Sequence, residues 1–542
     1  MSTGINVDVL AQGSQVEASD QGTQPESDVD TPKDEQVESG ESEYIEYRPI
    51  GVDNIENIDL YNKGGHHPVN LGDVLNGRYE VVHKLGNGGF GLVWLCQDTK
   101  TNKWRALKIL TAIDSAHSKE EKVYKHLLQT SSPMELENNH LVMPSEQFWI
   151  DGPNGRHYCI VLPVLGQNAA DWRSYTLKDK IRENNGRVSN QVQIELHRVC
   201  ADLVQAVRYL HERGVCHGDL KARNVLMRVE GLDKISKTEM LKLLGKPSTF
   251  RVETESGKSP APHAPEYIIV PAYGWWEGIT TSSPAITDFG ESYLISDPPN
   301  FNVMSFGYAP PEVIWEKTFQ PGFHSDIWSL AATLYELVCD EAMFDDQDVG
   351  CILRDFEFFL GGLPQPYRAV YFEEWRAMSG RPLDTATQKE NQTGAIDEVR
   401  WEKRTIKSKY ESLIEEREAI VKRTGYADHF EAALGAPSCY CPNIHNEELT
   451  LDERNERIYI HLPREDVIGV ADLLRKMIRY DPAKRITISE VANHPWIKKS
   501  SKVPATTYLL AQLNPGRVVK ALAILSAAVI VYVSRSRRSQ SI

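Results

Sequence analysis

The chain has 542 residues, of which 41% are hydrophobic, enough for a sizeable core and for a two-lobed domain with tails and insertions. The formal net charge is −16, but residues 1–46 hold twelve acidic residues and one Lys, so most of the acidity belongs to that segment and does not indicate an acidic groove for basic substrates. Eight scattered cysteines predict reduced thiols of a cytoplasmic or nuclear protein and argue against a disulfide framework.

The first segment, residues 1–46, is rich in Gln, Ser, Glu and Asp and poor in aromatic residues. Such a composition cannot bury enough apolar surface to offset the entropy of ordering, so we expect a disordered acidic tail. Its beginning lacks a charged stretch followed by an apolar run, which predicts no signal peptide. Residues 47–77 then lead into the first predicted strand.

A strand is predicted at 78–82, and residues 86–93 follow it with the pattern G-x-G-x-x-G-x-V. A dinucleotide-binding turn has the same glycine spacing but opens into a helix, whereas residues 92–96 are apolar, β-branched and aromatic. The glycines therefore belong to a strand-turn-strand hairpin that can cover a triphosphate, and no GK[ST] of a P-loop follows. The residues that we place against the nucleotide are Leu85, Gly86, Asn87, Gly88, Gly89, Phe90, Gly91 and Val93.

The strand predicted at 104–110 carries Lys108 two residues after Ala106, an A-x-K pattern whose ammonium group can bind phosphates. A solvated strand lysine is the alternative, and a carboxylate partner would decide between the two. Apolar residues three, four and seven positions after Glu120 define one helical face with Glu120 in line. Glu120 is therefore the expected partner of Lys108, and Glu121 is the alternative.

Residues 217–224, His-Gly-Asp-Leu-Lys-Ala-Arg-Asn, place an acid, a cation and an amide at the spacing that phosphoryl transfer needs. Asp219 can accept a hydroxyl proton, Lys221 can face the γ-phosphate, and Asn224 can offer a neutral oxygen to Mg²⁺. A surface turn with a helix-capping Asp would show the same letters, so the motifs elsewhere in the chain must decide.

Downstream motifs complete the set. Asp288-Phe289-Gly290 follows a short apolar strand and supplies a carboxylate for Mg²⁺. Asp326 opens an apolar helix and can bond to the backbone of the loop at 217–224. Glu312, in Pro310-Pro311-Glu312, and the late Arg485 are expected to pair, which is a structural role.

In this order, the motifs resemble the eukaryotic protein-kinase family over about residues 78–498. The resemblance implies an α+β, bilobal fold, with a small β-rich N-lobe with one helix at about 78–164 and a larger, mainly α-helical C-lobe at about 165–498. It implies ATP and Mg²⁺ as cofactors and adenine contacts with the backbone of Pro163 and Leu165, where proline keeps its carbonyl acceptor and leucine its N–H. The catalytic residues that it implies are Lys108, Glu120, Asp219 and Lys221, and the metal ligands are Asn224 and Asp288.

Within this family, residues 61–73, 93–95 and 162–166 are similar to kinases that phosphorylate serine/arginine-rich proteins. A large insertion at about 229–284 also resembles theirs, and a second insertion at about 345–460 fits the wider group that contains those kinases. The resemblance implies a Ser/Thr kinase with protein substrates, including candidate Arg/Ser-rich ones. We expect a monomer without direct nucleic-acid binding.

Some residues depart from the family pattern. Gly218 replaces the arginine usual between His and Asp, so a phosphate on the activation segment would lack its main cationic partner, and we predict activity without that phosphorylation. Residues 288–290 and 307–312 also differ from the Arg/Ser-directed branch, which puts arginine-directed specificity in doubt. The main rival is a catalytically inactive kinase-like scaffold. A nucleotide-dependent oxidoreductase rests only on the glycines and predicts NAD binding.

The C-terminal segment, residues 499–542, contains an apolar stretch at 518–533 followed by a basic Ser/Arg run. This stretch is a candidate membrane contact, although as a helix of about 24 Å it is short for a hydrocarbon core of about 30 Å. A packed terminal helix or a disordered basic end is the alternative, and the Ser/Arg run is a candidate internal phosphoacceptor. Cys439, Cys441 and His445 offer at most three ligands for a metal, so we expect none there.

Overall fold

The computed structural model describes residues 44–177, 190–299, 304–315, 321–344, 349–364, 418–435, 438–440, 458–460 and 462–499, with Tyr367 and Glu415. The elements below lie in one compact unit that begins at Ile45. The predictions for residues 1–43 and 500–542, and for Cys441 and His445, fall outside the described residues. Within the described ranges, no helix combines the length and apolar character needed to cross a bilayer.

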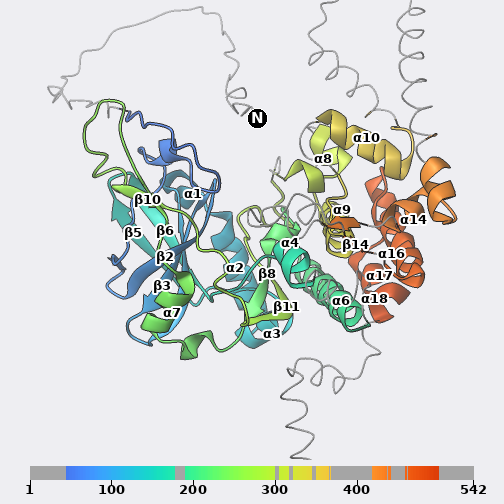
Figure 1. Ribbon diagram of the computed structural model, residues 1–542, viewed down its shortest axis with the longest axis horizontal. Helices are drawn as coiled ribbons and strands as arrows, with labels where there is room; N and C mark the ends of the chain where they lie inside the picture. Colours follow the sequence, from blue (N-terminus) through green and yellow to red (C-terminus); the bar gives the residue numbers. More distant parts are fainter. Residues whose placement is uncertain are drawn as a thin grey trace, which may run out of the picture. The chain divides into compact units, whose positions relative to one another are not determined.

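The N-terminal part of the unit is an antiparallel sheet of six strands in the order β1-β2-β3-β4-β6-β5 (Figure 1). Gly88 pairs with Gly91, which confirms that the glycines form a hairpin. Alternating buried residues of the central strands, such as Leu107 and Ile109, face the core because successive side chains of a strand point to opposite faces. The strands are β1 (Val74–Leu75), β2 (Tyr79–Gly88), β3 (Gly91–Asp98), β4 (Lys103–Leu110), β5 (Glu146–Gly152) and β6 (Gly155–Leu162).

Three helices, where the sequence predicted one, accompany this sheet: α1 (Ala112–Ala116), α2 (Lys119–Thr130) and α3 (Pro133–Asn138). Helix α2 is the predicted one, with Glu120, Val123, Tyr124 and Leu127 buried along one face. Each short helix has its own N-cap, Thr111 for α1 and Ser132 for α3.

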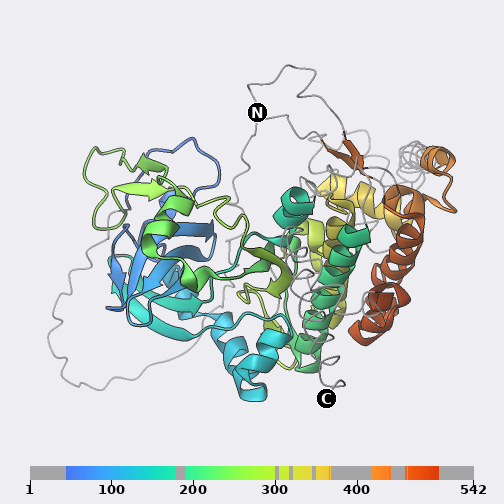
Figure 2. The ribbon, with the colours of Figure 1, turned by 60° about the horizontal axis from the view of Figure 1, so that its bottom comes forward.

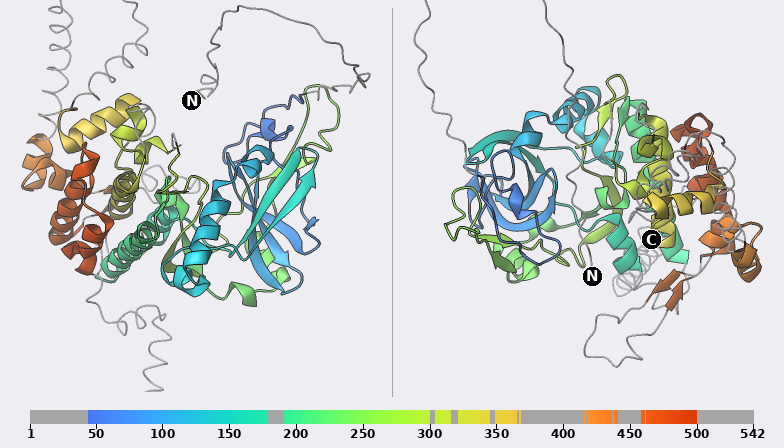
Figure 3. Two further views of the ribbon diagram at one scale, coloured as in Figure 1. Left: turned by 180° about the vertical axis from the view of Figure 1, so that it is seen from behind. Right: turned by 90° about the horizontal axis from the view of Figure 1, so that it is seen from above.

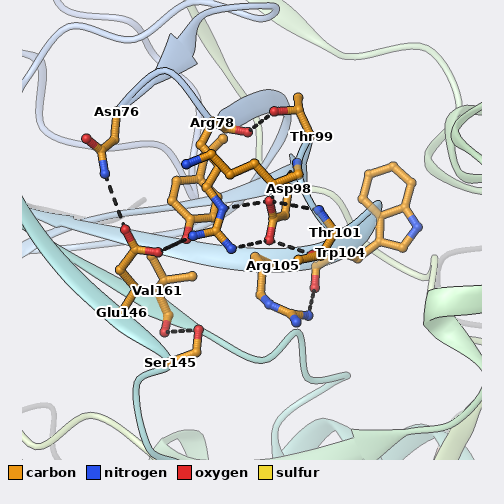
Figure 4. A network of polar contacts seen from close by, with 12 residues as sticks. Asn76, Arg78, Asp98, Thr99, Thr101, Trp104, Arg105, Ser145, Glu146 and Val161 are labelled. Carbon is orange, nitrogen blue, oxygen red and sulfur yellow. Dashed lines mark hydrogen bonds and ion pairs between the residues drawn. The ribbon is translucent and has the colours of Figure 1, made fainter.

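A charged network links strands of the sheet that do not pair with one another (Figure 4). Arg78 donates to both carboxylate oxygens of Asp98 at 2.7 Å and to Glu146 at 2.5 Å. Asp98 also accepts from Thr101 at the turn between β3 and β4, so the network joins the start of β2 to that turn and to β5. A bidentate arginine–carboxylate pair of this kind is stronger and more specific in geometry than a single hydrogen bond.

The lead-in segment is part of the sheet's core. Tyr61 and Val69 are buried in the same apolar cluster as the strands, and β1 is the first strand of the sheet. Ile45 donates to the Asn62 side chain at 2.9 Å, so structure begins before residue 47. The described lobe therefore starts earlier than residue 78, where the sequence motifs begin.

The first insertion packs against the sheet through two apolar clusters (Figure 3). It contains helix α7 (Lys237–Leu244) and a two-stranded ribbon of β9 (Thr249–Arg251) and β10 (Tyr267–Ile269). Its buried residues complete two apolar clusters of the N-terminal region: Leu232, Met240, Val252, Ala264, Ile268, Ile269 and Trp275. The insertion leaves from β8 (Val225–Val229) and returns to β11 (Thr280–Ile286), which pair antiparallel.

The C-terminal part is mainly helical. Helix α6 (Asn190–Glu212) packs against α9 (Phe323–Cys339), α17 (Ile488–Asn493) and α18 (Pro495–Lys499), as Figure 2 shows. Thirteen of the residues in α9 are buried, which makes it the central helix of this core. The other described helical elements of this part are α4 (Ala169–Asp171), η2 (Trp172–Leu177), η3 (Ala222–Asn224), η5 (Phe306–Tyr308), α8 (Pro311–Trp315), α10 (Val349–Leu360), α14 (His429–Leu434), α16 (Arg464–Met477) and η6 (Pro482–Lys484).

Short strands complete the described structure. Strand β7 (Val215–Cys216) pairs with β12 (Tyr293–Leu294), and β13 (Ser438–Tyr440) pairs with β14 (Ile458–Ile460). Cys96, Cys159, Cys200, Cys216 and Cys339 are free thiols, as the composition predicts.

Candidate active site

Lys108 connects two elements that are far apart in the sequence. It lies on β4 between Val93 of β3 and Ile160 of β6. Its Nζ atom is 2.8 Å from Glu120 Oε1 on α2 and 2.8 Å from Asp288 Oδ1 after β11. The partner is Glu120 and not Glu121, which pairs with Lys125 on the exposed side of the same helix.

The electrostatics of this triad favour a charged lysine. Burial lowers the pKa of Lys108, but the charges of Asp288 and Glu120 outweigh burial and hold the pKa above its ordinary value. The charge of Lys108 lowers the pKa of Asp288, whereas burial raises the pKa of Glu120. A cation is therefore fixed between α2 and the segment that follows β11.

The pairing of β8 with β11 brings the two predicted metal ligands to the same end of the ribbon. Val225 pairs with Ile286, so Asn224 precedes one strand and Asp288 follows the other. Thr287 N donates to Asn224 O at 2.9 Å and holds the two ends together. Asp288 has a φ of 62°, a left-handed conformation that costs energy for a non-glycine residue and is typical of functional sites.

Asp219 is the centre of a second polar group. Lys221 Nζ lies 2.6 Å from Asp219 Oδ2, and Asn224 Nδ2 donates to Asp219 Oδ2 at 3.0 Å and to its backbone oxygen at 2.8 Å. Among the described residues, Asp219 Oδ1 is buried without a hydrogen-bond partner. A buried carboxylate oxygen without a donor is costly, so this atom is suited to receive one from a bound hydroxyl group.

Sequence reasoning missed Ser305. Its hydroxyl oxygen accepts a hydrogen bond from Lys221 Nζ at 2.9 Å, so Lys221 is held between Asp219 and Ser305. Ser305 lies seven residues before Glu312 and two residues before the stretch 307–312 that departs from the family pattern. Its position shortly before Glu312 was the sequence feature that could have indicated Ser305.

Asp326 holds the loop that carries Asp219, as predicted. Its carboxylate accepts from the backbone N–H groups of His217 at 2.8 Å and Gly218 at 3.0 Å, and His211 Nε2 lies 3.0 Å away. Gly218 has a φ of 80°, a region that favours glycine. Gly218 therefore does more than omit an arginine side chain, because it also relaxes the turn before Asp219.

The predicted pair of Glu312 and Arg485 is present and fully buried. The two guanidinium nitrogens lie 2.5 and 2.6 Å from the two carboxylate oxygens. Arg485 also donates to the backbone oxygens of Arg479 and His324. The pair braces the end of the segment that contains Ser305.

Of the predicted nucleotide-contacting residues, Val93 on β3 pairs directly with Lys108. Gly91 lies so close to β4 that an added Cβ would be 2.3 Å from Ile109 O, so glycine is required there. Leu162, the last residue of β6, pairs with Ala106, which places Pro163 and Leu165 directly after this pair. The adenine contacts of Pro163 and Leu165 remain a prediction.

The residues present fit Mg²⁺. This ion prefers hard oxygen ligands and is usually bound by one or two carboxylates together with substrate phosphates. Asp288 offers a carboxylate, and Asn224 keeps its amide oxygen because its nitrogen is used toward Asp219. Their roles as metal ligands remain predictions.

The chain is similar to known protein kinases. The model of the family described as "Protein kinase domain" matches residues 79–274 and 279–497. Serine/threonine-protein kinase spk-1 of Caenorhabditis briggsae is 36% identical over 184 residues, which cover 33% of this chain and 15% of the relative. SRSF protein kinase 3 of Homo sapiens is 35% identical over 191 residues, covering 33% of this chain and 31% of the relative.

A serine/threonine protein kinase of Aspergillus fumigatus aligns over more of the chain. It is 24% identical over 455 residues, covering 82% of this chain and 90% of the relative. A crystal structure of a kinase domain covers 80% of this chain and 98% of its own length at 19% identity, with a TM-score of 0.43.

Proposed function

Because this chain belongs to the protein kinase domain family, we propose that it transfers the γ-phosphoryl group of ATP to Ser or Thr hydroxyl groups of protein substrates. The observation that carries the proposal is the pairing of Lys108 with Glu120 and Asp288, together with the unpartnered oxygen of Asp219. Two of the similar proteins, from Caenorhabditis briggsae and Aspergillus fumigatus, are named serine/threonine protein kinases.

In this mechanism each residue has a separate task. Mg²⁺, held by Asn224 and Asp288, would neutralise phosphate charge when bound. Lys108, kept in place by Glu120, binds the phosphates of the nucleotide. Asp219 Oδ1 accepts the hydrogen bond of the acceptor hydroxyl and takes its proton, while Lys221 offsets charge on the γ-phosphate.

The competing proposal is a kinase-like scaffold without catalysis. An inactive relative would be expected to lack the phosphate-binding lysine, the base or a metal ligand. Lys108, Asp219, Asn224 and Asp288 are all present, and hydrogen bonds join them into two groups. We therefore favour the active enzyme.

We also propose that activity does not require phosphorylation of the activation segment. Gly218 removes the arginine that would bind such a phosphate. Instead, Lys119 at the start of α2 lies 2.8 Å from Glu291, whose side chain is 9% exposed. This carboxylate follows Gly290 directly and holds α2, and with it Glu120, without added phosphate.

Arg/Ser-rich proteins are the proposed substrate class. The support is the 35% identity to SRSF protein kinase 3 over a third of the chain, whereas residues 288–290 and 307–312 argue against it. Phosphorylation of a degenerate peptide library would test the preference. Selection of arginine next to the acceptor is expected, and a library profile without arginine would contradict it.

The test of catalysis is transfer of radiolabelled phosphate from ATP to a mixed protein substrate. Lys108→Met should abolish transfer, because it removes the cation of the triad. Lys103→Met is the matched control, since Lys103 is exposed on the same strand. Equal labelling by the wild type and Lys108→Met, or none by a folded wild type, would refute the proposal.

A further inference from the structure

Residues 272–276 of the first insertion contact both edges of the proposed nucleotide site. At one end, Ala272 N donates to Lys84 O at 2.9 Å. At the other end, the indole Nε1 of Trp276 donates to Gln167 Oε1 at 2.8 Å. We call this segment the 272–276 strap.

The first anchor is a rigid point of the sheet. Lys84 is fully buried on β2 and forms an ion pair with Glu56 of the lead-in segment. Its Nζ also lies 5.1 Å from the ring centre of Trp94 on β3. Leu85 and Gly86 follow directly, so the strap is attached at the root of the glycine hairpin.

The second anchor is equally well fixed. Gln167 is 5% exposed, and its backbone oxygen accepts from Met227 N at 2.9 Å. Gly166 N donates to Met227 O at 2.8 Å, so both residues are held by β8. Gln167 comes two residues after Leu165, where the adenine contact is predicted.

Apolar packing joins the strap to the walls of the site. Trp275 is buried in a cluster that also contains Ala106 and Val164. Trp276 packs against the same cluster. So do Leu85 and Val93, which are predicted to contact the nucleotide, and Leu162, which precedes Pro163. Movement of the strap would therefore disturb the apolar surface on which adenine is expected to lie.

We propose that the 272–276 strap is a positioning element that ties the root of the glycine hairpin to Gln167 and keeps the nucleotide site in its binding conformation. The inference rests on the proposed function and deepens it, because it assigns control of ATP affinity to the insertion. A site that is already arranged loses less conformational freedom on binding. The strap should therefore change nucleotide affinity more than the rate of phosphoryl transfer.

The experiment measures the dissociation constant of a non-hydrolysable ATP analogue with Mg²⁺ by calorimetry, on the full chain. Trp276→Phe keeps an aromatic ring but removes the N–H donor, and Gln167→Met removes the acceptor. Each should weaken binding by about two- to tenfold, the worth of one hydrogen bond, and kcat should change little. Trp149→Phe is the matched control, because Trp149 lies partly exposed on β5.

The double variant decides whether the two side chains act as a pair. If the strap works as proposed, Trp276→Phe has almost no further effect when Gln167 is already Met. Additive effects, or dissociation constants within twofold of the wild type for both folded variants, would overturn the inference. Since binding is measured directly, a chain that binds the analogue but transfers no phosphate would refute the proposed function and leave the strap standing.

Discussion

Glu312→Gln should destabilise the C-terminal helical region strongly. The substitution leaves the guanidinium group of Arg485 buried with its charge unpaired, beside backbone oxygens that compensate it only in part. Removing one partner of a buried ion pair costs about 3–5 kcal/mol. With a slope of about 3 kcal/mol per molar urea, the midpoint of unfolding should fall by about 1–1.7 M.

The assay is urea unfolding followed by tryptophan fluorescence, because Arg485 lies 4.9 Å from the ring centre of buried Trp328. Glu212→Gln is the control: it breaks the exposed pair of Arg208 and Glu212 on α6, worth about 0.3–0.5 kcal/mol. The double variant Glu312→Gln, Arg485→Met should lose less stability than Glu312→Gln alone, since no charge stays buried. A midpoint shift for Glu312→Gln no larger than that of Glu212→Gln would refute the reasoning.

Three further predictions concern the loop around Asp219. Asp219→Asn should lower kcat by about 10²–10⁴ while the melting curve stays unchanged, and near-normal turnover would remove Asp219 as the base. Gly218→Ala should cost about 1 kcal/mol in chemical unfolding because of its positive φ, and an unchanged midpoint would argue against strain there. Burial raises the pKa of Asp326, but His211 and the loop N–H groups hold it below its ordinary value of 3.8. The ionised Asp326 carboxylate therefore contributes its full stabilisation above pH 3.8 and loses it as the pH falls below that value. The free energy of unfolding, measured from pH 5 to pH 3, should fall less steeply in Asp326→Asn than in the wild type.

The parts of the site that the sequence predicted are those whose chemistry demands particular side chains. A phosphate-binding lysine needs a carboxylate partner, and the helical periodicity selected Glu120 on α2 correctly. The contacts of Asp326 with the loop and of Glu312 with Arg485 followed from the order of the motifs. In each case the type of residue and its place in the order of motifs were enough to predict the contact.

Other contacts depend on long-range packing that no local pattern shows. Lys84 on β2 looks like a solvated strand lysine, yet it is buried against Glu56, 28 residues earlier. The packing of the first insertion on the sheet could not be predicted either. Its apolar residues show no sustained helical or strand periodicity that would indicate which surface they cover. The positive φ of Gly218 was not predicted, because the motif indicates only that glycine stands where an arginine is usual.

The pairing of β8 with β11 has a consequence for protein engineering. The strands meet on either side of the first insertion, so the chain departs and comes back at almost the same point. A truncated version with a short turn between them would still hold Asn224 opposite Asp288. It would also expose the hydrophobic surfaces of the sheet that Ile268 and Met240 now cover. Such a shortened enzyme should need polar substitutions on these surfaces to remain soluble.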